Sequence, residues 1–415
     1  MSYLKRFLAT KQGRVRKRYK YYEMKNLVEE LSIPMSNEFR YIDEVLGWCS
    51  KSVDSIADRI RFRTFENDLF NMNQIFNMNN KDILIDSAIL GALITACDFI
   101  YISKGEDDFP RLQVIDGHNA TGVIDPITNM MTEGYAVLSR DVETPSKILT
   151  EAYFTQEETI IYDKVAGTET RIYNPAPYCL LVPVINRPDA RRQFGHSRIT
   201  RACMNLQQGA LRTLRLSEIS AFFYSYPQKY VLGTNPDDEP LEKFKAAVST
   251  MLEISADQEG NVPTLGQFTQ QSMTPYTDQI KMFASLFAGE TGLTLDDLGF
   301  ATDNPSSAES IKAAHENLRL CARKAQKDFS VALINTGYLA TCVRDDFPYL
   351  RNKFYETQVK FEPIFEPDMN TISSIGDGAI KMNQAVPGYF NKDNLRDLTG
   401  IEASKQSTVV GVTNE

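Results

Sequence analysis

The sequence predicts an α+β protein of two to three structural modules, and three observations support this. The chain has 415 residues, 42% of them hydrophobic and 24% charged, which is ordinary for a globular protein. Helical periodicity marks the start and the second half of the chain, whereas short alternating runs fill the region 99–173. This composition excludes a disordered, collagen-like or low-complexity chain.

The charge balance argues against a protein that holds DNA tightly. The 45 basic and 54 acidic residues give a net charge of −9, whereas phosphate neutralisation favours a basic protein. The first twenty residues are different, with eight basic side chains and no acid. We expect this basic arm, 1–20, to be solvated and mobile, with contact to an anionic partner as the alternative.

The cysteines and the apolar segments argue against metal centres and membrane spans. No two of the six cysteines form a C-x-x-C pair, so we expect buried thiols in a reducing compartment. The start of the chain lacks the apolar region of a signal peptide. The most apolar stretch, 83–102, contains Asp86 and Asp98, each of which would cost about 2.5–3.5 kcal/mol at mid-bilayer. We therefore expect a buried helix followed by a strand.

Residues 1–195 read as helices followed by an antiparallel sheet. Apolar residues at helical spacing predict an amphipathic helix over 36–65 and a second helix over 82–96. Turn residues then separate six runs that are typical of strands: 99–103, 111–115, 134–139, 148–154, 158–162 and 170–173.

A long helix is predicted over 196–223, after a junction at 186–195 that contains Pro and Arg. It would be about 40 Å long. One sector is apolar, and another is polar: Arg198, Arg201, Asn205, Gln208, Arg212 and Arg215. We expect this polar face either to be solvated or to lie near an anion or an acidic neighbour.

A strand–helix–strand unit follows, and then a second long helix. The unit would have strands at 228–233 and 262–269 around a helix at 241–254. Thr274-Pro275 suits a helix start, with Thr as the cap, and Gly289 and Gly292 suit its end.

A polar loop, 294–305, precedes the longest predicted helix. Ser306-Ser-Ala-Glu309 is a capping box that starts this helix, which continues to about 342. His315 falls in its apolar sector, so we expect a satisfied core histidine. The remaining segments predict a strand over 354–361, helices near 370–384 and 391–399, and a mobile tail from 404.

The motifs of common enzymes are absent. The chain has no G-x-x-x-x-G-K-[ST], G-x-G-x-x-G, H-E-x-x-H or G-x-S-x-G sequence. Acidic clusters could bind Mg²⁺, but each lies in a turn or beside Pro or Gly, where solvated acids are common: 107–108, 237–239, 296–297 and 345–346. We therefore expect no catalytic residue, no metal, no cofactor and no enzyme activity.

The order of short motifs resembles the tailed-bacteriophage portal protein family, in the SPP1-type and HK97-type group. The resemblance covers roughly residues 80–400. Its motifs in chain order are Ser87-Ala-Ile-Leu-Gly-Ala-Leu93, Phe194-Gly-His-Ser-Arg-Ile199, Leu286-Phe-Ala-Gly-Glu-Thr-Gly-Leu293, Leu298-Gly299 and Asn304-Pro-Ser-Ser-Ala-Glu309.

The resemblance divides the chain into the parts of a portal fold. It implies an α+β wing at 1–195, a stem helix at 196–224, a small α/β clip at 225–273, a second stem helix at 274–292, a tunnel loop at 293–305, a long tunnel or wing helix at 306–343, a wing return at 344–370, and a short helical crown with the tail at 371–415.

Portals of this family form a ring, commonly of twelve copies, at one capsid vertex. The resemblance thus implies a structural protein of the virion, assembled in the host cytoplasm, that acts as a DNA packaging and ejection channel and as a head–tail connector. Ring contacts are head to tail and must close. The implied partners are other copies of the chain, double-stranded DNA in transit, the terminase large subunit, a head–tail adaptor protein, the major capsid protein and a scaffold protein, with no membrane.

The resemblance also implies which residues meet DNA. The tunnel-loop residues expected to face the bore are Asp296, Asp297, Thr302, Asp303, Asn304 and Pro305. The basic residues expected to face the channel or to pair with the next subunit are Lys312, Arg319, Arg323, Arg198, Arg201, Arg212 and Arg215. A twelve-fold ring would carry on the order of −100 charges, which disfavours tight phosphate binding in a conduit.

Two other functions remain open from the sequence. A head-associated minor capsid protein that is no conduit would be a monomer or an assembly without an axial hole. A metal-dependent nucleic-acid enzyme would use the acidic clusters and would cleave DNA.

Overall fold

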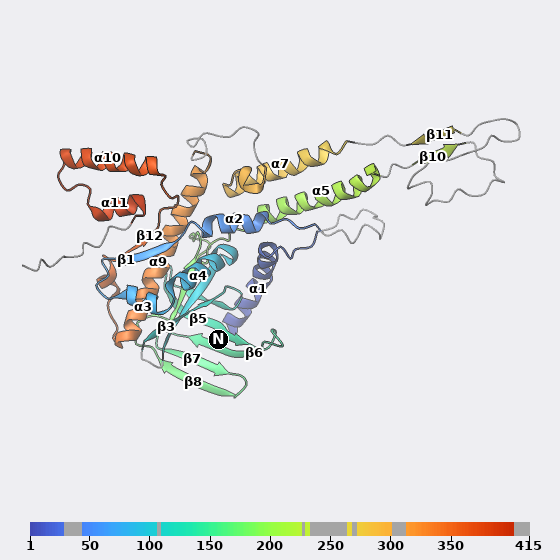
Figure 1. Ribbon diagram of the computed structural model, residues 1–415. Helices are drawn as coiled ribbons and strands as arrows, with labels where there is room; N and C mark the ends of the chain where they lie inside the picture. Colours follow the sequence, from blue (N-terminus) through green and yellow to red (C-terminus); the bar gives the residue numbers. More distant parts are fainter. Residues whose placement is uncertain are drawn as a thin grey trace, which may run out of the picture. The chain divides into compact units, whose positions relative to one another are not determined.

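The computed structural model describes residues 1–28, 44–105, 109–225, 229–232, 264–267, 272–300 and 313–401, and its mixture of helices and antiparallel sheets confirms the α+β class (Figure 1). The chain divides into two compact units. The first contains Met1–Tyr22, Ser50–Ile199 and Ser306–Glu415, and the second contains Glu23–Cys49 and Thr200–Pro305. None of the described helices is long and apolar enough to cross a membrane.

Two antiparallel sheets form the core of the first unit. One has the strand order β3-β2-β9, and the other runs from β4 to β8 in chain order. The strands are β2 Cys97–Lys104, β3 Pro110–Ile115, β4 Ala120–Ile124, β5 Met131–Arg140, β6 Ile148–Phe154, β7 Glu158–Asp163, β8 Thr168–Tyr173 and β9 Leu181–Ile185.

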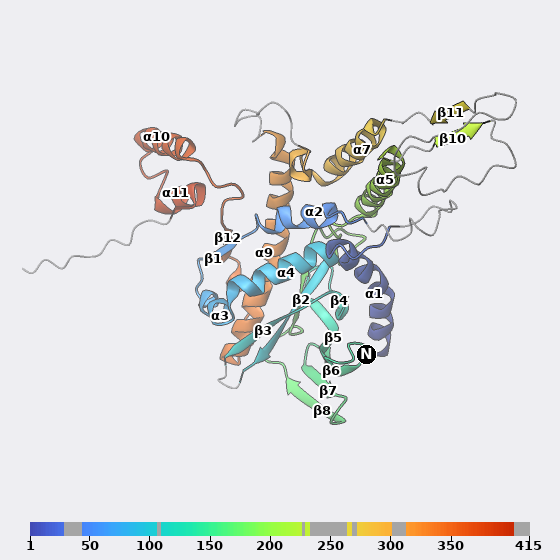
Figure 2. The same cartoon turned by 45° about the vertical axis from the view of Figure 1, so that its right-hand side comes forward.

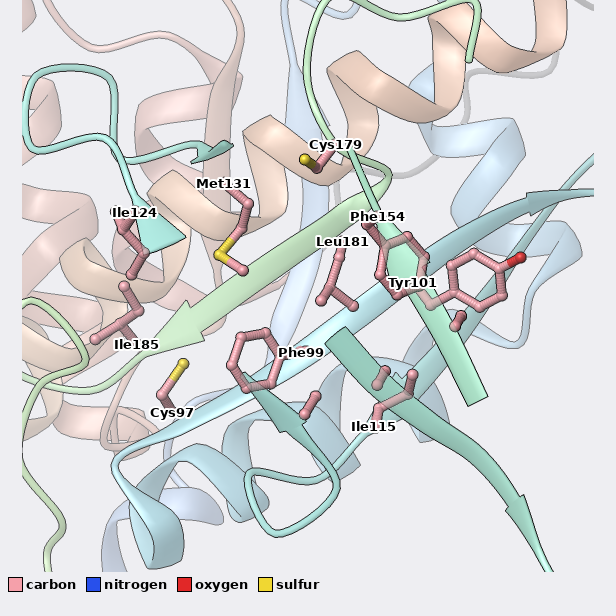
Figure 3. Packing of buried hydrophobic residues seen from close by; sticks show 13 residues of the cluster. Cys97, Phe99, Tyr101, Ile115, Ile124, Met131, Phe154, Cys179, Leu181 and Ile185 are labelled. Atoms are coloured by element: carbon pink, nitrogen blue, oxygen red, sulfur yellow. The ribbon is translucent and has the colours of Figure 1, made fainter. Parts of the chain in front are cut away.

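The two sheets meet in one apolar cluster (Figure 3). Phe99 and Tyr101 of β2 lie in it with Met131 and Phe154 of the five-stranded sheet. The rings of Tyr101 and Phe154 are 5.2 Å apart. Side chains alternate along a strand, so Ile100, which is also fully buried, points to the opposite face, where helices contact β2. Strand β2 is therefore buried on both faces.

All six predicted strands of this region are present, and two further strands were missed. Gly122 weakens the apolar alternation of β4, and Pro183 in β9 lacks the N–H of a ladder hydrogen bond. Strand β9 tolerates Pro183 because it lies at the edge of its sheet, paired only with β2.

Helices cover the outer face of the three-stranded sheet. The predicted helix over 82–96 is α4, Lys81–Thr95, and the longest predicted helix is α9, Glu316–Asp345. Both contact β2 and β9. The short helix α3, Met72–Met78, packs against α9, where Met72 fills the space beside Gly337.

The prediction for His315 is wrong. His315 is only half-buried, at the N-terminal boundary of α9, where its ring lies edge-on to Phe365 with centroids 6.2 Å apart. Helical spacing placed it on the apolar face, but the core begins one turn later, at Leu318. The capping box at 306–309 lies outside the described residues.

The predicted helix over 36–65 is also wrong in its extent. Helix α2 covers only Trp48–Ala57, and residues 36–43 lie outside the described part of the chain. The chain turns after α2 and forms β1, Phe62–Glu66, which pairs with β12, Gln358–Phe361. The aromatic rings of β1 explain the strand, because Phe65 packs against Phe76 at 4.9 Å in the apolar layer.

The N-terminal arm is a packed helix, contrary to the expectation of a solvated and mobile segment. Helix α1 covers Ser2–Tyr22 and buries Leu4, Leu8 and Val15 along one face. Leu4 and Leu8 pack on β5 beside Tyr135. This apolar stripe has the spacing of an amphipathic helix. The prediction of a solvated arm gave more weight to the eight basic residues than to this spacing.

The second unit contains two long helices that lie side by side in both views (Figures 1 and 2). They are α5, Arg201–Ser225, and α7, Thr274–Thr291, and they are the two predicted long helices of this region. They approach closely at Gly209, where an added Cβ would lie 2.8 Å from two ring carbons of Phe283. Gly292 ends α7 with φ of 71°, as predicted for a glycine C-cap.

The start of each long helix differs slightly from the prediction. Residues 196–200 are not helical, because Ser197 and Arg198 bond to main-chain carbonyls of α4. Thr274 is the first residue of α7 rather than its cap. Two short strands lie between these helices in the sequence. Strand β10, Lys229–Leu232, follows α5, and strand β11, Thr264–Gln267, precedes α7. The two strands pair with each other. The predicted helix at 241–254 lies outside the described residues.

The two predicted C-terminal helices are present. Helix α10 covers Met369–Ala385 and α11 covers Lys392–Thr399, and the side chains of Asp368 and Asn391 cap them. The predicted strand over 354–361 begins only at Gln358, after a 3₁₀ turn at Arg351–Phe354. Residues 402–415, which include the predicted mobile tail, are not described.

Asp98 is a buried carboxyl at the start of β2. Its Oδ1 atom accepts hydrogen bonds from Thr95 Oγ1 at 2.8 Å and from the Gly117 N–H at 2.9 Å. Gly91 of α4 makes room for it, because a Cβ there would lie 1.7 Å from Asp98 Oδ2. Burial, with a smaller contribution from Asp116, raises the pKa of Asp98 to about 8.

This shift predicts a pH-dependent stability. Between about pH 4 and pH 8 the folded state binds one proton more than the unfolded state, so the free energy of unfolding should fall as pH rises, by at most about 1.4 kcal/mol per pH unit. Asp98→Asn imitates the protonated acid and should flatten this slope. Urea unfolding from pH 5 to 8.5 measures both, and equal slopes in parent and variant would contradict the prediction.

The close approach of α5 and α7 predicts opposite effects for two matched substitutions. Gly209→Ala should destabilise the helix pair by roughly 1–3 kcal/mol, because the new methyl group displaces Phe283. Gly289→Ala should stabilise α7 by about 0.5–1 kcal/mol, because nothing lies within 4 Å of that position. Urea unfolding compares the variants, and a gain in both would show that Gly209 is not a packing constraint.

Candidate functional site

The α5–α7 pair and the segment after α7 carry most of the residues that the sequence assigned to the channel. In this unit Trp48 packs against Phe287 of α7 and against Phe300 beyond it, with ring centroids 5.6 and 6.5 Å apart. Thr200 Oγ1 donates to Glu290 Oε1 at 3.2 Å, across the two helices. The end of α7 is therefore held by apolar contact with Trp48 and by a hydrogen bond to Thr200, just before α5.

Two glutamines of α5 bind main chain rather than solvent. Gln207 Oε1 accepts from the Cys49 N–H at 2.8 Å, and its Nε2 donates to the Leu46 carbonyl at 2.6 Å. Gln208 Nε2 donates to the Leu27 carbonyl at 2.9 Å. Sequence reasoning missed this role, because periodicity cannot distinguish an exposed glutamine from one that satisfies a neighbouring segment.

The arginines predicted on this face differ in exposure. Arg201 is exposed and Arg212 is half-buried, whereas Arg215 is only 5% exposed. Arg215 lies close enough to Glu44 to lower its pKa, although burial and Glu218 raise that pKa overall. For Arg215 the structure thus favours the alternative of an acidic neighbour over a solvated face.

Arg198 belongs to the first unit and has a structural role there. It is 7% exposed, and its Nε donates to the Ser52 carbonyl at 3.2 Å. Its own N–H donates to the Leu93 carbonyl at 2.8 Å. In a single chain, neither Arg198 nor Arg215 presents its guanidinium group to a ligand.

The described part of the segment expected to be a tunnel loop, residues 293–300, contains a short capped turn. The Asp297 carboxylate accepts from Thr294 N–H and from Thr294 Oγ1, both at 2.9 Å, and Thr294 Oγ1 accepts from the Asp297 N–H at 3.2 Å. Asp297 is therefore occupied locally, whereas Asp296 is exposed. The other predicted loop residues lie outside the described residues: Thr302, Asp303, Asn304 and Pro305.

The basic residues at the start of α9 are solvent-facing. Arg319 forms an ion pair of 2.6 Å with Glu316 one turn earlier, and Arg323 is exposed. The Arg319 guanidinium lowers the pKa of the Glu316 carboxyl. Lys312 lies outside the described part of the chain.

The described residues hold no group of three or more His, Cys, Asp or Glu side chains placed to bind a metal ion. Asp345 of the cluster 345–346 forms an ion pair of 2.8 Å with Arg344, and Asp346 ends α9 in a left-handed conformation. All six cysteines are free, and five are buried, which confirms the prediction of buried thiols. Burial raises the pKa of Cys179 to about 12, as expected for an unreactive thiol.

Comparison with known proteins identifies relatives by sequence. No family model matches the chain. The portal protein of Mycobacterium phage L5 is 26% identical over 323 residues, and that of Mycobacterium phage D29 is 25% identical over 328 residues. Each match covers 72% of this chain and 65% of the relative, so the match spans less than two thirds of the relatives' length.

A solved structure is also similar, at low identity. It is the neck of a native GTA particle with C12 symmetry. The match covers 86% of this chain and 90% of the solved chain, with 13% sequence identity and a TM-score of 0.42. The two mycobacteriophage proteins carry the conclusion instead: the chain is a sequence relative of bacteriophage portal proteins, the family that its motif order resembles.

Proposed function

We propose that copies of this chain close into a ring at one capsid vertex, and that double-stranded DNA passes through the ring during packaging and ejection. The same ring would be the platform on which head and tail are connected. The observation that carries this proposal is the sequence relationship to two proteins named portal protein. Twelve copies is the number that we expect for the ring.

An exposed apolar stripe on α7 supports self-association. Met282 and Leu286 are 49% and 53% exposed, one helical turn apart, and Gly289 continues the same face. The other face of α7, with Phe283 and Phe287, packs inside the unit. A head-to-tail ring would cover the exposed stripe with a second copy.

The charge of the chain suits passage rather than retention of DNA. At a net charge of −9 per copy, a ring would not hold the phosphate backbone tightly. We propose Asp296 and residues 302–305 as the segment that faces the bore. Arg201, Arg212 and Arg323 keep the exposure needed to guide DNA or to pair with a neighbouring copy.

The partners and the location follow from this role. A ring at a capsid vertex would contact the major capsid protein and, during assembly in the host cytoplasm, a scaffold protein. A terminase large subunit would supply the ATP hydrolysis, for which this chain has no P-loop. A head–tail adaptor protein would bind the ring after packaging. The chain itself would be a structural component of the virion rather than an enzyme.

Negative-stain images of the purified protein test the proposal directly. We expect rings with a central hole of duplex width. Leu286→Ser should reduce the fraction of chains in rings, because about 1.5–3 kcal/mol of apolar burial per contact would be lost. Lys281→Ser, at an exposed polar position of the same helix, is the matched control.

Other results would favour the alternative functions. Single molecules at every concentration, or an assembly without a hole, would indicate a minor capsid protein. DNA cleavage by the pure protein, or stabilisation against heat by Mg²⁺, would indicate a nucleic-acid enzyme.

The loop role makes a separate prediction. Replacing both Asn304 and Pro305 with glycine should leave ring assembly unchanged but lower the yield of packaged genome, because the loop loses the fixed φ of proline. Packaged DNA per assembled head, compared between parent and variant, measures this. An unchanged yield would remove the loop from the mechanism.

A further inference from the structure

A basic pocket lies between helix α1 and the turn at 187–195. The cavity has a volume of about 380 Å³, and Phe7 and Phe194 form part of its wall. Its lining contains five cationic side chains and no acidic one: Lys11, Arg14, Arg18, Arg191 and Arg192. All of these residues belong to the first unit.

Protein carboxylates do not neutralise these five cations. Within the described residues, none of the five has an ion pair with Asp or Glu. The nearby Asp189 is occupied, because it contacts His196 Nε2 at 2.6 Å and accepts from the N–H groups of Arg191 and Arg192. Asp98 accepts hydrogen bonds from Thr95 and Gly117, which line the pocket, and its own side chain is fully buried.

Two of the cations are held rigidly by the fold. Lys11 Nζ donates to Thr121 Oγ1 at 3.0 Å and lies 3.6 Å from the centre of the Phe194 ring. Arg18 donates to the Thr95 carbonyl at 2.6 Å. Such fixed groups lose little conformational entropy when a ligand binds.

The turn that carries Arg191 and Arg192 is equally well defined. The Gly195 N–H donates to the Arg192 carbonyl at 2.9 Å. Gly195 has φ of 69°, and an added Cβ would lie 2.2 Å from the Asn186 carbonyl oxygen. The turn therefore needs glycine there, and it holds Arg191 and Arg192 at the pocket.

The clustering of like charges has an electrostatic cost in the unliganded protein. Burial, with a smaller contribution from Arg14, lowers the pKa of Lys11 to about 8. Burial, Arg14 and Arg192 lower the pKa of Arg18 to about 10. An anion in the pocket would relieve this repulsion.

We propose that this pocket binds phosphate groups, with room for a diphosphate such as pyrophosphate. Four arginines offer planar pairs of N–H donors that match phosphate oxygens. A cavity of about 380 Å³ suits a compact ligand and is too small to enclose a duplex. The phosphate could belong to a soluble diphosphate or nucleotide, or to the backbone of DNA at the pocket mouth, and the proposal does not depend on ring formation.

Titration of the full-length protein with pyrophosphate, followed by calorimetry at near-physiological salt, tests this. The key variant is Arg14→Gln with Arg191→Gln, because neither side chain has a hydrogen bond with the described residues. The control is Arg16→Gln with Lys20→Gln, which removes the same charge from exposed positions of α1 outside the pocket. Circular dichroism confirms that each variant is folded.

We expect saturable binding by the parent and the control, and binding weaker by at least about tenfold in the key variant. Competition with a short DNA duplex and with ATP then identifies the source of the phosphate. Displacement of pyrophosphate by the duplex assigns the pocket to the DNA backbone, and displacement by ATP alone assigns it to a soluble ligand.

Two results would overturn the proposal. One is the absence of saturable pyrophosphate binding by the parent protein. Another is equal affinity in the key variant and the control.

Discussion

The burial of strand β2 on both of its faces is the constraint on which the first unit depends. One face packs into the cluster around Phe99 and Phe154, and the other lies under α4 and α9. A strand covered on both sides must be apolar almost throughout, and Ile100 and Ile102 are both fully buried. The exception, Asp98, is tolerated because Thr95 and Gly117 donate hydrogen bonds to it. Each layer of the unit is therefore positioned by contact with one central strand.

The second unit depends on close helix packing and on satisfied main-chain groups. Gly209 lets α5 approach the ring of Phe283 on α7. Gln207 and Gln208 then bind the carbonyl groups of Leu46 and Leu27 and the N–H group of Cys49. These bonds replace the hydrogen bonds to water that the main-chain groups lose when they are buried, and so avoid the free-energy cost of an unsatisfied polar group. These two glutamines are thus structural, whereas Met282 and Leu286 on α7 are exposed.

The electrostatics of the chain separate into two patterns. The net charge is negative, as a conduit for DNA would require, but the cations of α1 and of the turn at 187–195 gather around one cavity. Most of the exposed ion pairs, such as that of Arg319 with Glu316, contribute little to stability. The cations of the pocket differ, because Lys11 and Arg18 are held by hydrogen bonds and none of the five forms an ion pair with a carboxylate of the described residues. The basic arm thus forms the packed helix α1, and it also contributes cations to the pocket that we propose as an anion site.

The sequence alone determined the elements whose pattern is local. Periodicity identified α4, α5, α7 and α9, alternation identified six strands, and motif order identified the relationship to portal proteins. The sequence did not show where the buried part of α9 begins, so His315 was placed wrongly. It also merged α2 with β1, because the aromatic residues of β1 suit a helical stripe as well as a strand. It read 1–20 as a solvated arm because eight charges outweighed the apolar spacing of Leu4, Leu8 and Val15. Tertiary structure decided which charges are buried, which glutamines bind main chain and which arginines share a cavity. Each of these depends on contacts between residues that are distant in the sequence, and a local sequence pattern does not show which distant residues will meet.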